Sequence, residues 1–389
     1  MKITAINDLH CDAGWRVFSF LKVSTDEGLI GWSEYNESYG SGGLTAVIRS
    51  LAEGLIGADP RAVETITATL RGITRQAPGG INQQAIAAIE NALVAVKAKA
   101  LGVPVYEMLG GPLRDRFRLY WSHCGTYRLR QAKALGVDPL TSLDGVRRLG
   151  EEVAERGFTA LKTNIFLFDG DEGALHMPGF GRGPGAPELN ADRSLIEALK
   201  AQIGAFRDGA GDVDILLDLN FNFKTEGYIK VARALEPYGL MWVEIDSYDP
   251  AALATIRRAA PMPLASCESL YGRRQFKPFF DHQSMDVAIV DVPWNGILES
   301  VKIAAIAEAH EVNVAPHNFY GHLSTLMSAH FCATLPNFRI MEIDPDDVPW
   351  KDDLVTEPPV IEDGHLVLPT GPGWGADINE AAIRAHPPK

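Results

Sequence analysis

The spacing of apolar residues divides the chain into two parts. Residues 1–10 (MKITAINDLH) and 17–34 (VFSFLKVSTDEGLIGWSE) alternate apolar and polar positions around a turn at 26–28, which predicts an antiparallel sheet. From about residue 60 to residue 99 the spacing becomes helical, and Gly102 and Pro104 are expected to end that helical stretch. Residues 1–115 therefore predict an α+β domain that ends near the Gly-Gly-Pro at 110–112.

Strand-like runs alternate with helical stretches after residue 115. The first two are 117–123 (FRLYWSH) and 159–166 (TALKTNIF). Six more runs lead to Asp218, Glu244, Glu268, Asp291, His317 and Glu342, at intervals of 26, 24, 23, 26 and 25 residues. This stride is typical of consecutive βα units, so the eight runs predict an α/β fold, a (β/α) TIM barrel over residues 116–350. The carboxyl ends of its parallel strands share one face, where we expect the six side chains to gather.

Two segments do not follow this stride. Lys162 and Asp218 are 56 residues apart, and the surplus at 168–190 is rich in Gly and Pro without helical or strand periodicity. We expect that segment to be a loop that overhangs the strand ends and contacts the substrate, rather than decoration. The last segment, 351–389, holds a strand-like run at 365–369 and is expected to return to the N-terminal domain.

Composition narrows the class of partner. The formal net charge of −14 argues against nucleic acid and anionic membranes, but one cation in a pocket would still admit an anionic small molecule. No basic segment precedes an apolar core at the start, and no apolar stretch is long enough to span a bilayer, so we expect a cytoplasmic protein. Four cysteines lie far apart, which favours free buried thiols.

Three carboxylates follow consecutive predicted strands: Asp218, Glu244 and Glu268. Carboxylates brought to one point repel one another, and a divalent cation resolves that conflict. Three hard oxygen ligands with open positions for water and substrate suit Mg²⁺. The alternative is that each acid caps a helix or pairs with a basic side chain at the rim.

These motifs resemble the enolase superfamily. Asp218-Leu219-Asn220, then Glu244 and then Glu268 in SCES are similar to its ligand series. The stretch AIAAIENALVAVKAKALGVPVYEMLGG resembles the end of the capping domain in the mandelate racemase group, and IVDVPWNGI, APHN and MEIDPDDVPWKDDL match the same group. The resemblance implies an α+β capping domain over a modified barrel, Mg²⁺, a small-molecule carboxylate substrate, and abstraction of the proton α to that carboxylate. It also implies, weakly, a homo-oligomer.

The resemblance assigns roles to polar residues on the other strands. His317 is the candidate base, with Asp291 holding its ring, although a lone histidine is more often structural. Lys162 matches the first lysine of the group's Lys-x-Lys motif, which supports the substrate carboxylate. Glu342 matches the carboxyl group on the eighth strand, expected to be protonated or strongly hydrogen-bonded. The acids that follow it at 344, 346 and 347 are expected to form a solvated loop.

Asn164 departs from the motif. The group usually carries a second lysine at this position, and an amide cannot accept a proton at neutral pH. A single base favours a dehydratase, in which His317 removes the α-proton and returns it as the β-hydroxyl leaves. Asn164 then either bonds a substrate hydroxyl or only orders the strand end. A racemase, epimerase or cycloisomerase with a base elsewhere, such as on the 168–190 loop, is the alternative, and a sugar-acid-binding protein without turnover is another.

Candidate substrate contacts are mostly polar, which favours a polyhydroxylated acid sugar over an aromatic acid. They are Arg16, Tyr39, His123, Asn220, Asn222, Asn318 and Tyr320, with His176, Arg182, Lys224 and His322 nearby, and Trp15 and Trp294 as an apolar wall. Each of them alone is more often a surface or packing residue.

Overall fold

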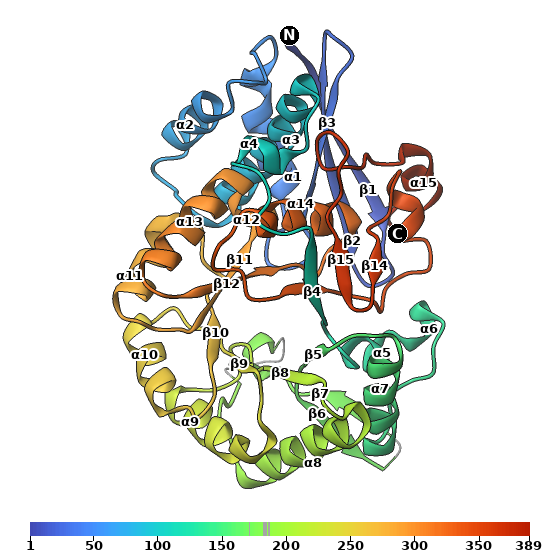
Figure 1. Cartoon of the computed structure of the whole chain (residues 1–389), viewed down its shortest axis with the longest axis vertical. Helices are drawn as coiled ribbons and strands as arrows, with labels where there is room; N and C mark the ends of the chain where they lie inside the picture. The colour runs from blue at the N-terminus through green and yellow to red at the C-terminus, as the bar shows by residue number, and fades with distance from the viewer. Residues whose placement is uncertain (171, 182–184, 186) are drawn as a thin grey trace.

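A computed structural model of the protein describes residues 1–170, 172–181, 185 and 187–389. Its N-terminal part is an antiparallel sheet with helices packed against it (Figure 1). The elements are β1 (Ile3–Asp12), β2 (Val17–Thr25), β3 (Ile30–Tyr35), α1 (Leu44–Ala52), η1 (Glu53–Leu55), α2 (Val63–Ile73), α3 (Gly80–Leu101) and α4 (Val105–Met108). The predicted turn lies between β2 and β3, and α3 ends at Gly102, whose φ of 71° is left-handed. Both predictions are confirmed.

The described residues also form eight parallel strands, each at a predicted run. They are β4 (Arg116–Trp121), β5 (Ala160–Thr163), β8 (Asp214–Asp218), β9 (Trp242–Glu244), β10 (Leu264–Ser266), β11 (Val287–Asp291), β12 (Asn313–His317) and β13 (Met341–Ile343). From β4 to β12 each barrel strand pairs in parallel with the next, and β13 pairs in parallel with β4. The Val314 N–H donates to the Asn337 carbonyl and the Arg339 N–H donates to the Val314 carbonyl, which completes the ring between β12 and the chain leading into β13. The predicted barrel is confirmed.

Helices connect the strands and surround the barrel (Figure 1). In chain order they are α5 (Thr126–Arg130), α6 (Ala132–Leu135), α7 (Leu143–Glu155), α8 (Arg193–Ala210), α9 (Thr225–Ala234), η3 (Glu236–Tyr238), α10 (Pro250–Ala259), α11 (Gly272–Asp281), α12 (Val292–Asn295), α13 (Ile297–Ala309) and α14 (His322–Ala333). Several begin at an acidic or hydroxyl cap: Ser142 before α7, Asp192 before α8 and Asp249 before α10 accept backbone N–H bonds.

The interior of the barrel is a separate apolar layer. It contains at least one residue from, or directly beside, each of the eight strands: Tyr120, Ala160, Leu216, Trp242, Ala265, Ile289, Ala315 and Ile340, together with Met241 and Val287. Their strand neighbours, such as Leu217 and Val243, belong to the larger core outside the sheet. Since successive side chains of a strand point to opposite faces, the residue two positions beyond each interior residue points inward again, at the carboxyl end.

The 168–190 segment contains regular structure, contrary to the prediction of a structureless loop. β6 (Phe166–Asp169) pairs antiparallel with β7 (Glu172–Leu175), and η2 (Pro178–Phe180) follows. The second barrel strand, β5, ends at Thr163. Phe166, which was predicted to belong to that strand, is instead the first residue of β6. Phe166, Leu167 and Phe168 are consecutive apolar residues that suit either strand, so periodicity alone did not separate β6 from β5. The predicted contact Arg182 lies outside the described residues.

The C-terminal segment contacts both parts of the molecule. Its elements are η4 (Asp352–Leu354), β14 (Ile361–Glu362), β15 (His365–Val367) and α15 (Glu380–Ala385). β15 pairs antiparallel with the start of β4, whereas Trp374 Nε1 donates to the Trp32 carbonyl at 2.8 Å. The boundaries near residues 115 and 350 stay predictions.

The N-terminal domain is fixed to the barrel by buried hydrogen bonds close to the strand ends. Glu34 of β3 accepts backbone N–H bonds from Gly321 (2.6 Å) and Ser324 (2.9 Å) at the start of α14. Asn91 of α3 donates to the Val292 carbonyl at 3.1 Å. The domain therefore holds the loops that follow β11 and β12.

Candidate active site

A ring of polar side chains lies directly above the apolar interior of the barrel. Its members are two residues beyond the interior layer: Ser122, Lys162, Asp218, Glu244, Asp291, His317 and Glu342. Glu268 is three residues beyond Ala265 instead, because Cys267 has a φ of 89° and breaks the alternation. All of the metal and acid–base candidates except Asn164 belong to this ring, and the barrel places them at one face.

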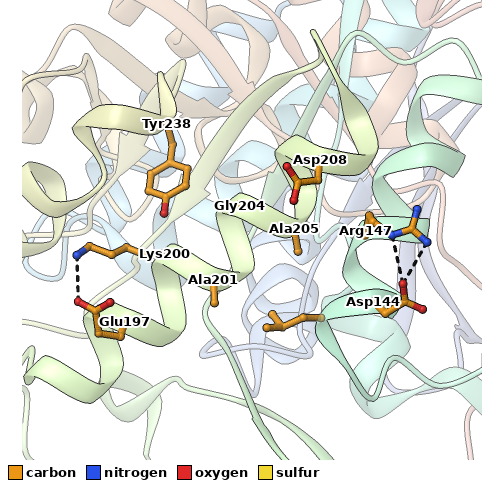
Figure 2. Close-up of a pocket in the computed structure, with 10 residues that line it drawn as sticks. Asp144, Arg147, Glu197, Lys200, Ala201, Gly204, Ala205, Asp208 and Tyr238 are labelled. Carbon is orange, nitrogen blue, oxygen red and sulfur yellow. Dashed lines mark hydrogen bonds and ion pairs between the residues drawn. The ribbon is translucent and has the colours of Figure 1, made fainter.

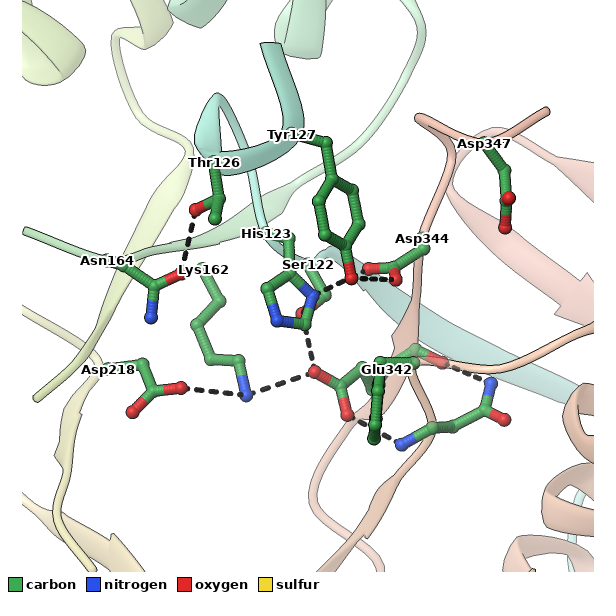
Figure 3. Close-up of polar contacts among 12 residues, drawn as sticks. Ser122, His123, Thr126, Tyr127, Lys162, Asn164, Asp218, Glu342, Asp344 and Asp347 are labelled. Carbon is green, nitrogen blue, oxygen red and sulfur yellow. Dashed lines mark hydrogen bonds and ion pairs between the residues drawn. The ribbon is translucent and has the colours of Figure 1, made fainter. Parts of the chain in front are cut away.

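Lys162 is the centre of one side of the ring. Its Nζ lies 3.0 Å from Glu342 and 3.9 Å from Asp218 (Figure 3), and 3.1 Å from Glu244. Burial lowers the pKa of Lys162, but Glu244 and Glu342 outweigh it and raise the pKa well above its ordinary value. Lys162 is thus a fixed positive charge and cannot accept a proton while these carboxylates surround it.

Glu342 is held on every side. Ser122 Oγ donates to it at 2.5 Å and the Asn318 N–H at 2.6 Å. Burial raises the pKa of Glu342, but Lys162 and His317 outweigh burial and bring it down to about 2. Of the two expected states, strongly hydrogen-bonded or protonated, the structure favours the ionised and strongly hydrogen-bonded one.

His317 and Asp291 form a buried pair on the opposite side of the ring. His317 Nδ1 lies 2.6 Å from Asp291 Oδ2, and Asp291 is fully buried. Asp291 also accepts bonds from the Tyr320 hydroxyl (2.5 Å) and the Trp294 N–H (2.7 Å). With Nδ1 engaged, Nε2 faces the ring, 3.6 Å from Glu268. Burial lowers the pKa of His317, but Glu268 and Asp291 outweigh it and raise the pKa to about 10.

Asn164 lies in the next layer out, beside Lys162. Its Oδ1 accepts a bond from Thr126 Oγ1 at 2.7 Å, and its Nδ2 donates to Asn220 Oδ1 at 3.3 Å (Figure 3). Asn220 in turn donates its backbone N–H to Asp218 Oδ1 at 2.9 Å. The Asn164 amide is therefore oriented by its neighbours and positions the turn that follows β8.

Two other predicted substrate contacts bond to the protein itself. The Asn318 side-chain amide donates to Thr325 Oγ1 and to the Glu342 carbonyl, and its oxygen accepts a bond from Ser324 Oγ. Asn222 accepts from the Gly179 N–H at 3.1 Å and donates to the His176 carbonyl at 3.4 Å, so it anchors the segment after β7. Their role toward substrate stays a prediction.

The remaining predicted contacts surround Phe319. Arg16 donates to the Phe319 carbonyl at 2.5 Å, and the rings of Tyr39 and His123 lie 5.8 and 6.0 Å from that of Phe319. Tyr320 is buried against Asp291. Of the outer candidates, Lys224 is exposed, His322 bonds Asp352, Trp15 packs on Tyr127, and Trp294 packs on His317.

The acidic segment after Glu342 is buried, so the prediction of a solvated loop is wrong. Asp344 lies 3.0 Å from His123, Asp346 2.9 Å from Arg128, and Asp347 2.7 Å from Arg16. Each of these basic partners lies more than 200 residues away in the sequence, which explains why local composition misled the prediction. Arg16 is therefore already paired with carboxylates in this structure.

The donor set fits a hard divalent cation, although the side chains are not gathered around a point. No group of three or more His, Cys, Asp or Glu in the described part of the chain is arranged to hold a metal ion. Burial raises the pKa values of Asp218, Glu244 and Glu268, and other carboxylates of the ring add to each rise. Oxygen donors in mutual repulsion are those that a cation would draw together.

One acid of this group was missed by the sequence analysis. Asp246 is 4% exposed, and its Oδ1 has no hydrogen-bond partner among the described residues. Burial, then Glu268 and Asp218, raise the pKa of Asp246 well above its ordinary value. Its spacing of two from Glu244 was a usable signal, because both side chains then share a strand face.

A surface groove of about 620 Å³ lies elsewhere, between α7 and α8 (Figure 2). Its lining includes Asp144, Arg147, Glu197 and Lys200, which pair among themselves, and it contains none of the predicted site residues. All four cysteines are buried and free, as predicted. No helix in the described ranges is long and apolar enough to cross a membrane.

Comparison with known proteins agrees with the fold and the ring. Residues 13–110 match the mandelate racemase/muconate lactonizing enzyme N-terminal domain, and residues 145–382 match the enolase C-terminal domain-like family. The chain therefore belongs to the enolase superfamily, in its mandelate racemase/muconate lactonizing enzyme group, and is an enzyme of that superfamily.

Individual relatives carry two kinds of name. The chain is 30% identical to D-galactonate dehydratase of Ralstonia nicotianae, covering 98% of this chain and 94% of the relative. It is 29% identical to D-xylonate dehydratase of Haloferax volcanii, covering 94% and 84%. A crystal structure of a "putative L-alanine-DL-glutamate epimerase" from Burkholderia xenovorans, bound to magnesium and fumarate, is 53% identical with a TM-score of 0.97, covering 100% and 96%.

Proposed function

We propose that this protein is a magnesium-dependent dehydratase of acid sugars, which removes the α-proton of the carboxylate and expels the β-hydroxyl to give a 2-keto-3-deoxy acid. The observation that carries the proposal is the asymmetry of the ring. One side holds an imidazole oriented by a buried carboxylate, whereas the other side holds Lys162, with the Asn164 amide just outside the ring in place of a second base. The dehydratases among the relatives support the same reaction class.

The roles follow from where each group lies. Asp218, Glu244 and Glu268 would hold Mg²⁺, which supplies a positive charge for the substrate carboxylate. His317 Nε2 accepts the α-proton while Asp291 keeps Nδ1 protonated. Lys162 places its ammonium where negative charge develops on the carboxylate oxygens. The His317 imidazolium then returns the proton to the departing hydroxyl.

The proposal requires His317 to be neutral before reaction. Its pKa of about 10 leaves it protonated at neutral pH while the charge of Glu268 is uncompensated. Neutralising Glu268 by a cation removes a main cause of that rise, so cation binding and base readiness are coupled. In the Burkholderia relative, magnesium and fumarate are bound together, which supports a small carboxylate as the ligand of such a site.

Epimerisation of a carboxylate is the second candidate, because the relative of 53% identity is named an epimerase. That reaction needs a proton acceptor on each face of the α-carbon. Lys162 is on the side opposite His317, but it is surrounded by carboxylates that keep it protonated. This arrangement is the reason for ranking dehydration first.

The two candidates differ in the mass of their products. We would incubate the enzyme and MgCl₂ with a panel of aldonates and aldarates, and follow 2-keto acid formation with mass spectrometry. Loss of one water from a panel member, absent with His317→Asn, is the expected result. A mass-conserving change of configuration, with no 2-keto acid from any member, would refute dehydration in favour of epimerisation.

A further inference from the structure

Asp246 occupies an unassigned position on the inner face of the barrel mouth. Along β9 and its extension, Trp242 belongs to the barrel interior, whereas Val243 and Ile245 belong to the core outside the sheet. Glu244 and Asp246 are the alternate residues, so both point inward. The Asp246 N–H donates to the Asn220 carbonyl at 3.2 Å. The N–H of the same Asn220 donates to Asp218, so Asp246 lies beside the turn that follows β8.

This carboxylate is buried without compensation. It is 4% exposed, its Oδ1 has no partner, and no Lys or Arg of the described residues lies within ion-pairing distance of it. The nearby ammonium of Lys162 is directed to Glu244, Glu342 and Asp218. A buried acid that lacks both hydrogen bonds and a counter-charge is costly, and retaining one next to three other carboxylates calls for a positive partner.

We infer that Asp246 is a fourth carboxylate of the cation site, contributing an oxygen on the side where Asp218 and Glu268 lie. The inference rests on the proposed function, since the cation is the Mg²⁺ proposed there. Affinity of a hard cation rises with the number of charged oxygens around it, so Asp246 would tighten the site without entering the proton transfer.

The test measures Mg²⁺ binding rather than turnover. Titration calorimetry with MgCl₂ compares the wild-type enzyme with Asp246→Asn, which keeps the shape and removes the charge. We expect the Kd for Mg²⁺ to rise about 10- to 100-fold. The control is Asp212→Asn, an exposed acid before the start of β8, which changes the net charge equally and is expected to leave the Kd unchanged.

Thermal unfolding provides a second readout. Without divalent ions, Asp246→Asn should unfold at a higher temperature than wild type, since the variant neither buries a charge nor has to take up a proton on folding. Added MgCl₂ should raise its Tm less than that of wild type. An equal Kd for the two proteins, or a lower Tm of the variant without ions, would overturn the role of Asp246 alone. A wild-type enzyme that binds no Mg²⁺ would overturn the cation of the proposed function as well.

Discussion

The two sides of the polar ring are built on the same barrel layer but differ in what their charges can do. On the β11–β12 side, one nitrogen of His317 is fixed by Asp291 and the other faces the ring, 3.6 Å from Glu268. The side chains of Phe319 and Trp294 lie 4.8 and 5.4 Å from the imidazole. On the β5 side, Lys162 and Asn164 are fully engaged with neighbouring polar groups. The His317 side is suited to proton transfer, whereas the Lys162 side provides a fixed positive charge.

Removing the His317 imidazole should have the largest effect, because it removes the proposed base from its side of the ring. His317→Asn is expected to lower the rate of α-proton exchange and of turnover by about 10²- to 10⁴-fold, the usual contribution of a general base. The measurement is incorporation of solvent deuterium by NMR. His282→Asn, an exposed histidine after α11, serves as the control and should change nothing. Exchange at the wild-type rate in His317→Asn would move the base to another residue.

Removing the Lys162 ammonium on the opposite side of the ring should reduce the stability of the folded protein. Lys162→Met leaves Glu244 and Glu342 buried without their counter-charge, and we expect the free energy of unfolding to fall by about 3–5 kcal/mol. Urea denaturation measures it. The matched control is Lys230→Met, whose pair with Glu226 is exposed and contributes about 0–1 kcal/mol. Equal losses for the two variants would mean that Lys162 is not the electrostatic centre of its side.

The raised pKa of His317 predicts a pH dependence of stability in the absence of divalent ions. The folded pKa of about 10 lies above the ordinary value of 6.5, so the folded state binds the proton more tightly. The resulting stabilisation is complete below pH 6.5 and is lost as the pH rises toward about 10. Urea denaturation in EDTA across this window should show a decline in wild type that is shallower in His317→Asn. Parallel profiles would contradict the pKa.

Asn164 should have the smallest of these effects. Asn164→Ala removes the bonds to Thr126 and Asn220 and is expected to cost about 1–3 kcal/mol of unfolding free energy, measured by urea denaturation. Asn82→Ala, which removes one exposed bond, is the control. A substrate KM that rises while stability stays unchanged would instead assign Asn164 to a substrate hydroxyl.

The barrel could be predicted because its signal is local and repeated. Each strand needs only a short apolar run, and the polar residue after it reaches the ring through the two-residue alternation. The same rule fails at Cys267, whose left-handed backbone shifts Glu268 by one position, and the sequence carried no sign of that kink. Spacing alone still placed Glu268 in the correct ring.

Long-range partners could not be predicted in the same way. Whether Asp347 is solvated depends on Arg16, 331 residues earlier, and the burial of Asp246 depends on how the turns after β8 and β9 pack. The hairpin of β6 and β7 was missed because only Asn164 and Ile165 separate β5 from β6, so the two short strands read as one run. Such features depend on tertiary packing, which a single sequence does not encode by periodicity.

With His317 as the single proposed base, protons are expected to be exchanged on one face of the α-carbon only. The most direct measurement follows an acid-sugar substrate recovered part-way through reaction with MgCl₂ in D₂O, by NMR of the α-carbon. We expect any deuterium found there to be accompanied by the original configuration, with a 2-keto-3-deoxy product accumulating beside it. Deuterium in the inverted epimer would show a second base on the Lys162 side and contradict a single base at His317.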